Sequence, residues 1–225
     1  SVSRGLGDVY KRQIMLNKMS KKNILFVGLA ISALCMTSCS KQPDFDAKSY
    51  VQSSLDAEYH EQYADYANLM EISEEDVKKQ VVEDFNESIR QQFASSDNIT
   101  EEEIAAYTEK MAEVKKLAKY KVQDEKKDED GNYTISVKVE PSDVFQTLQQ
   151  SSAEVSKEKI AQGMKETDPG VFASVLTESV QKSIDKNSYG DPVTVTVKVE
   201  KNHSGTYDLS ETERNKLETV MFPTE

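Results

Sequence analysis

The sequence predicts an α+β fold in which an antiparallel sheet of about four strands, arranged as two hairpins, packs in two layers against about six helices. Apolar residues recur at every third or fourth position through the first half of the chain, as in amphipathic helices. Two later segments, 133–140 and 193–200, instead alternate apolar and polar residues, as half-buried strands do. Glycine, proline and asparagine separate these segments and supply the turns.

The chain begins with segments that we expect to lie outside this fold. Residues 1–18 are interpreted as a non-native or untranslated leader, with the true start at Met15 or Met19. Residues 19–38 then combine two lysines, an almost wholly apolar run and a pair of small residues, which is the order found in secretory signal peptides. The apolar run is well short of the roughly 20 residues that a membrane-spanning helix needs.

Cys39 follows the small residues directly. Residues 36–39 (Met-Thr-Ser-Cys) resemble a lipobox, the site at which bacterial lipoprotein signal peptidase cuts and the cysteine receives lipid. This resemblance implies lipidation at Cys39, a lipidated tether over residues 39–45, and residence at the extracytoplasmic face of the cell membrane. Residues 46–223 are then expected to form a single α+β domain with a helical first half and two hairpin-containing units.

Charge and cysteine content limit the chemistry of the processed chain. Residues 39–225 carry 22 basic and 39 acidic side chains, a net charge of −17. Such a charge repels nucleic acid, so no nucleic-acid partner is expected. Cys35 would leave with the signal peptide and Cys39 would carry lipid, which excludes a disulfide or a thiol site.

The first helix of the domain is predicted over residues 46–72. Its apolar face carries a stripe of large residues: Leu55, Tyr59, Tyr63, Tyr66 and Met70. We favour packing against the rest of the domain as the role of these tyrosines, because a tyrosine can bury its ring while its hydroxyl stays in contact with water. The alternative is an aromatic ligand-binding face made of Tyr59, Tyr63 and Tyr66.

Later helices are predicted from their caps. Ser73 with Asp76, Thr100 with Glu103, and Ser210 with Glu213 have the spacing of helix N-caps and capping boxes. Two further starts are predicted, one at Ser142 and one at Asp168 with Pro169 in the first turn.

The strands are predicted as two hairpins. One starts near Tyr120, turns at residues 130–131 and returns over 133–140; the other pairs 193–199 with a segment from Thr206. The tip of the first hairpin, residues 124–132, is dense in charge but lacks the ligand spacing of an EF-hand calcium loop. Segments 133–140 and 193–200 are alike, which is explained either by a duplication or by the shared demands of half-buried strands.

No cofactor, metal site or catalytic residue is predicted. His60 and His203 are the only histidines, and no nucleophile, zinc or phosphate-loop motif accompanies them. The carboxylates are so numerous that a pair chosen from sequence carries almost no information.

As a whole, the chain is similar to small Gram-positive surface lipoproteins whose domain has no assigned function. The likeness rests on the lipobox, on the tyrosine-rich helix leading into residues 72–75 (Ile-Ser-Glu-Glu), and on residues 195–200 (Val-Thr-Val-Lys-Val-Glu). It covers most of residues 45–221 and implies an extracytoplasmic α+β domain without any catalytic residue.

The expected function is therefore non-enzymatic binding or scaffolding at the cell surface. The partners would be membrane lipid through Cys39 and an unknown protein, peptide or small ligand. One alternative is an envelope chaperone or secretion accessory, suggested by the charged helix over 101–119. A second is a hydrolase with an unrecognised site around His60, which requires a carboxylate beside that histidine.

Overall fold

The computed structural model describes residues 45–94, 99–165, 167–202 and 205–224. Within them the elements are α2 (Ala47–His60), α3 (Ala64–Met70), α4 (Glu74–Phe93), α5 (Glu101–Lys115), β1 (Lys119–Lys127), β2 (Tyr133–Glu140), α6 (Leu148–Ala161), α7 (Val171–Lys186), β3 (Val193–Lys201), β4 (Tyr207–Asp208) and α8 (Glu211–Met221). The α+β class and the four-stranded antiparallel sheet are confirmed. None of the helices in these ranges has the length and apolar character needed to span a membrane.

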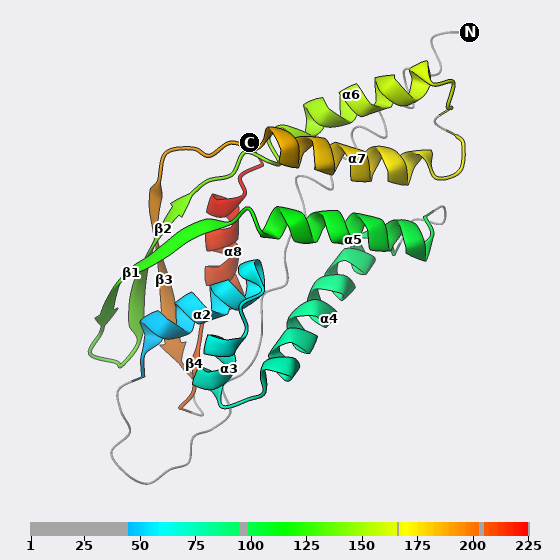
Figure 1. Ribbon diagram of the computed structural model, residues 1–225. Helices are drawn as coiled ribbons and strands as arrows, with labels where there is room; N and C mark the ends of the chain where they lie inside the picture. Colours follow the sequence, from blue (N-terminus) through cyan, green and yellow to red (C-terminus); the bar gives the residue numbers. More distant parts are fainter. Residues whose placement is uncertain (1–44, 95–98, 166, 203–204, 225) are drawn as a thin grey trace.

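The sheet has the order β1-β2-β3-β4 and contains both predicted hairpins. In its centre Val137 lies opposite Val122 on one side and Val195 on the other. Strict alternation along β2 and β3 buries one face and leaves the other polar and exposed. Helices α2 and α8 cover the apolar face (Figure 1), as the alternation predicts.

The helix predicted over residues 46–72 is wrong in one respect, because the structure divides it into α2 and α3. Glu61 adopts a left-handed backbone conformation (φ 57°), and its N–H donates to the carbonyl of Asp56, which ends α2. Glycine usually takes this position at the end of a helix, so a glutamate there gives no sequence signal. The turn redirects the chain so that Tyr63 and Tyr66 are still buried.

The helix caps are largely as predicted. The Ser73 hydroxyl accepts from the N–H of Asp76 at 3.0 Å, and Thr100 and Glu103 form a complete capping box. The Ser210 hydroxyl also accepts from the N–H of Glu213. The Glu213 carboxylate, however, accepts from the backbone N–H of Lys198 in β3 at 3.1 Å and so joins α8 to the sheet.

Two predicted helix starts are wrong. Ser142 pairs with Tyr189 in an isolated bridge and donates its hydroxyl to Asn187 at 2.6 Å, so α6 begins only at Leu148. Asp168 accepts from the N–H of Lys165 in a turn, and α7 begins at Val171. In both places a polar side chain that resembles a cap stabilises a turn or a long-range contact instead.

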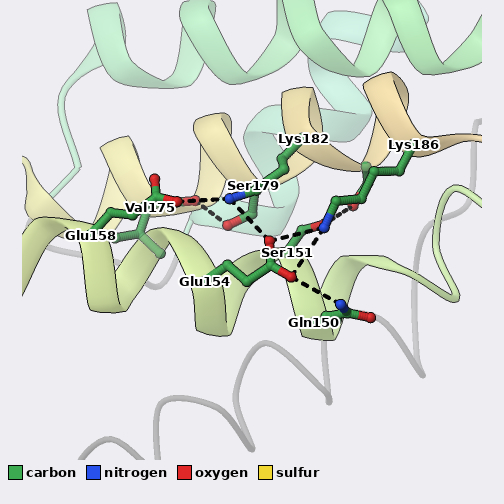
Figure 2. A network of polar contacts seen from close by, with 9 residues as sticks. Gln150, Ser151, Glu154, Glu158, Val175, Ser179, Lys182 and Lys186 are labelled. Carbon is green, nitrogen blue, oxygen red and sulfur yellow. Dashed lines mark hydrogen bonds and ion pairs between the residues drawn. The ribbon is translucent and has the colours of Figure 1, made fainter.

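Helices α6 and α7 form a hairpin that projects beyond the sheet, with α7 against α5 and α6 outermost (Figure 1). Polar groups connect the two helices (Figure 2). Lys182 lies 2.8 Å from Glu158, and Lys186 lies 2.9 Å from Glu154. Val155 is the one apolar side chain of α6 that is fully buried, so α6 contributes little apolar surface to this contact.

Candidate ligand pocket

Two of the residues predicted from sequence lie outside the part of the chain that the structure describes. These are Cys39, together with the whole segment 1–38, and His203. Lipidation of Cys39 therefore stays a prediction.

The three candidate tyrosines are all buried, with exposed fractions of 3% for Tyr59, 7% for Tyr63 and 0% for Tyr66. Burial raises the pKa of each hydroxyl. Tyr59 and Tyr63 line a pocket, whereas Tyr66 packs deeper against Tyr50, with 6.1 Å between the ring centres. Two of the three tyrosines thus line the pocket, and the third does not.

The pocket has a volume of about 200 Å³ and lies between the C-terminal end of α2, the middle of α4 and the second half of α5. Figure 1 shows these three helices enclosing one corner of the molecule. The lining residues are Glu58, Tyr59, Glu61, Tyr63, Val81, Val82, Phe85, Asn86, Thr108, Glu109, Ala112, Lys115 and Lys116. The wall therefore combines aromatic and aliphatic groups with charges of both signs.

Two of the lining charges are buried. Glu58 and Lys115 are each 6% exposed, and they come from α2 and from the last residue of α5. The Lys115 ammonium lies 4.6 Å from the centre of the Phe85 ring and 5.7 Å from that of Tyr59, both within cation–π range. A buried carboxyl group and a buried amino group thus both line the pocket, and Lys115 lies beside aromatic rings.

Burial shifts the pKa of both groups toward the neutral form. Loss of water raises the pKa of Glu58, although Lys115 and Arg214 oppose this shift. Loss of water likewise lowers the pKa of Lys115, against the opposing effect of Glu58 and Glu218. In both cases the unfavourable loss of hydration outweighs the favourable interaction with the neighbouring opposite charges.

The charge cluster continues behind the pocket into α8. Arg214 and Glu218 are also buried, and Arg214 pairs with Asp208 of β4 at 3.4 Å. Both α8 residues interact electrostatically with Glu58 or Lys115. Buried charges of both signs therefore continue from the pocket through α8, where Arg214 contacts Asp208 of the edge strand β4.

Sequence reasoning missed Glu58 and Lys115 because both are residue types that usually face water. A signal was nevertheless present. Glu58 follows Leu55 by three positions and Lys115 follows Met111 by four, so each falls on the buried stripe of its own helix. A charged residue on an apolar stripe marks a position worth testing.

At the rim, Glu61 and Lys116 form an ion pair of 2.9 Å in which both side chains are about half exposed. The pair joins the C-terminal ends of α2 and α5. The helix C-terminus carries partial negative charge, so two such ends meet at this side of the pocket.

His60, the other candidate from sequence, contributes to a separate polar network. Its Nδ1 lies 3.7 Å from the Asp56 carboxylate and 3.2 Å from the Tyr120 hydroxyl, and its ring stacks on that of Tyr120. Its Nε2 lies 2.9 Å from the Ala118 carbonyl. The hydrolase alternative requires a carboxylate beside His60, and Asp56 supplies one. Both ring nitrogens, however, already face groups of the chain itself.

Within the described ranges, no three histidine, cysteine or acidic side chains are grouped so that they could hold a metal ion.

No known protein family matches the chain, and no curated protein does. Among solved structures, the chain resembles the crystal structure of a "putative lipoprotein", YcdA, from Bacillus subtilis, with a TM-score of 0.57 and 12% sequence identity. The likeness covers 80% of this chain and 56% of that one, so the chain spans little more than half the length of its structural neighbour. At this identity the likeness shows a shared fold and nothing finer.

Proposed function

We propose that this protein is a lipid-anchored, extracytoplasmic binding protein without enzymatic activity, and that the pocket between α2, α4 and α5 is its ligand site. The observation that carries the proposal is the presence of a buried carboxylate and a buried ammonium, Glu58 and Lys115, on the wall of a pocket. Tyr59 and Tyr63 would contact the same ligand.

A purely structural role explains these charges poorly. Replacing a buried ion pair by apolar groups of similar volume is often neutral or stabilising, so such a pair is a weak source of stability. Charges that line a pocket can instead be used to orient a ligand, since binding sites combine apolar walls with a few placed polar groups.

The anchored location is supported by two observations of different kinds. Residues 19–39 have the order of a lipoprotein signal peptide ending in Cys39. The solved structure that shares the fold is named a putative lipoprotein.

The binding proposal is tested with probes of similar size and different charge. The full chain in detergent micelles is titrated with isocaproamide (neutral), isoamylamine (cationic), isocaproate (anionic) and leucine (zwitterionic). The readout is the NMR shift of the methyl groups of Val81, Val82 and Ala112, which line the pocket. Saturable shifts with at least one probe are expected, and their absence with every probe would exclude a small-molecule site here.

A blocking variant and a matched control locate the binding. Ala112→Phe should fill the pocket and abolish the shifts at Val81 and Val82. Ala106→Phe makes the same change on an exposed part of the same helix, outside the lining, and should leave binding intact. Equal binding by both variants would place the ligand elsewhere.

A further inference from the structure

We infer that the ligand is a small zwitterion, of the size of a free amino acid with an apolar side chain, whose ammonium faces Glu58 and whose carboxylate faces Lys115. This inference rests on the proposed function and assigns the chemical class of its ligand.

The two buried residues of the pocket carry opposite charges. Glu58 and Lys115 are both buried and both line the pocket, so a guest meets one acidic and one basic group in the same pocket. A purely cationic guest would be attracted by Glu58 and repelled by Lys115, and a purely anionic guest would meet the reverse. Only a guest with both charges gains from both residues, because electrostatic interactions are strong in a poorly solvated site.

The rim of the pocket also carries two residues of opposite charge. Glu61 and Lys116 carry opposite charges at the mouth of the pocket. The converging C-terminal ends of α2 and α5 add partial negative charge there. A zwitterionic guest therefore meets charges of both signs at the mouth of the pocket as well as inside it.

The size of the pocket sets an upper limit on the ligand. Its volume of about 200 Å³ is below the roughly 300–1,000 Å³ of sites for drug-sized molecules. A peptide of several residues would have to leave most of its atoms outside. A single amino acid fits the available space better.

The remaining wall indicates an apolar side chain on the ligand. Val81, Phe85 and Ala112 present carbon surface between the charges. Burying a side chain the size of leucine against such a wall is favourable, because it removes apolar surface from water.

The electrostatic state of the two residues agrees with this picture. For both Glu58 and Lys115, loss of water is the largest influence on the pKa and outweighs the neighbouring charges of the chain. Each charge would therefore be stabilised further by an opposite charge brought in by a ligand.

The test compares the affinities of the same probes on the unmodified protein, so it needs no variant that has to fold. Leucine should bind at least about tenfold more tightly than isoamylamine, isocaproate or isocaproamide, a difference of about 1.4 kcal/mol. A preference for leucine of less than about tenfold over any of the other three probes would overturn the zwitterion inference and leave the proposed binding function standing.

Two variants assign the contacts. Glu58→Gln should weaken the binding of leucine and isoamylamine, which carry an ammonium, and should not weaken that of isocaproate, which loses a repelling charge. Lys115→Met should weaken the binding of leucine and isocaproate, which carry a carboxylate, and should not weaken that of isoamylamine, which loses a repelling charge. Glu129→Gln and Lys157→Met make matched changes at exposed sites outside the pocket lining and should leave all affinities unchanged. Uniform weakening of every probe by either pocket variant would contradict the assigned contacts.

Discussion

The hydroxyl of Tyr120 donates a hydrogen bond of 2.7 Å to Oδ1 of Asp56 and so joins the first strand of the sheet to the first described helix. The same carboxylate accepts two bonds of 2.9 Å from the side chain of Gln52. Burial first, and then the bond to Asp56, raises the pKa of Tyr120. The tyrosine therefore remains a donor throughout the ordinary pH range.

Removing this hydroxyl should destabilise the fold. Tyr120→Phe is expected to lower the free energy of unfolding by about 1.5–2 kcal/mol, because hydrogen bonds to charged groups contribute roughly 1.5–3 kcal/mol and this one is only partly buried. Urea unfolding measures the change. In an Asp56→Ala background the same substitution should cost much less, since only the longer contact of 3.2 Å with Nδ1 of His60 remains. An equal cost in both backgrounds would show that the hydroxyl acts through another group.

Glu58 and Lys115 should be energetically coupled. The two buried charges act on each other electrostatically, and removing one of two interacting buried charges typically costs about 3–5 kcal/mol because the other is left less compensated. We expect Glu58→Gln and Lys115→Met to destabilise the fold separately, and the double variant to lose at least about 1 kcal/mol less than the two losses added together. Urea unfolding of the unmodified protein, both single variants and the double variant gives this coupling. Strict additivity would mean that the two charges are compensated by other groups.

The sheet could be predicted well because its signal is local. Along β2 and β3 every second residue is apolar, and this period of two determines which face is buried whatever the strands pack against. The caps at Ser73 and Thr100 are local in the same sense, since each bond spans three residues. The failed start at Ser142 is different, because its partners Asn187 and Tyr189 are distant in sequence.

The pocket could be predicted only in part for the same reason. The stripe containing Tyr59 and Tyr63 indicates one wall, but the helices α4 and α5 that close the pocket are placed by tertiary packing. Nor does sequence show that Glu61 turns the chain left-handed, since its side chain favours no such conformation. The buried charges become apparent only when α2 and α5 are brought together.

The contact between α6 and α7 should weaken in acid. Hydrogen bonds from Lys186, Lys182 and Gln150 lower the pKa of Glu154 to about 2 from its usual 4.5. A carboxyl whose pKa is lower in the folded state stabilises the fold above its ordinary pKa and loses that contribution as the pH falls toward the folded value. The contribution of Glu154 should therefore decline between about pH 4.5 and pH 2.

This decline can be followed at α6 itself. Hydrogen-exchange protection of the amides of Ser151 and Val155 should be lower in Glu154→Gln than in the unmodified protein at pH 7, and the difference should close as the pH falls to 2. Because the side chain is on the surface, the effect is expected to be small and to shrink further in high salt. Glu129→Gln, at the exposed tip of the β1–β2 hairpin, is the matched control. A difference that persists unchanged at pH 2 would show that Glu154 acts by packing.

Lipidation should depend on Cys39 and not on Cys35. In cells fed a labelled fatty acid, Cys39→Ala should abolish labelling and leave a larger, uncleaved precursor, because the lipobox lacks its cysteine. Cys35→Ala makes the same substitution inside the segment that cleavage removes, and it should be labelled and cut normally. Membrane association alone is a poor readout, since the retained apolar run of the precursor can itself hold the chain at a bilayer. A lipidated chain is held at the membrane because each buried CH₂ of an attached acyl chain contributes about 0.8 kcal/mol to membrane binding. An uncleaved precursor can be held there by its apolar run instead. The fatty-acid label and the size of the chain distinguish these two forms, since only a modified Cys39 carries the label. Labelling that survives Cys39→Ala, or disappears with Cys35→Ala, would refute the assignment of the anchor.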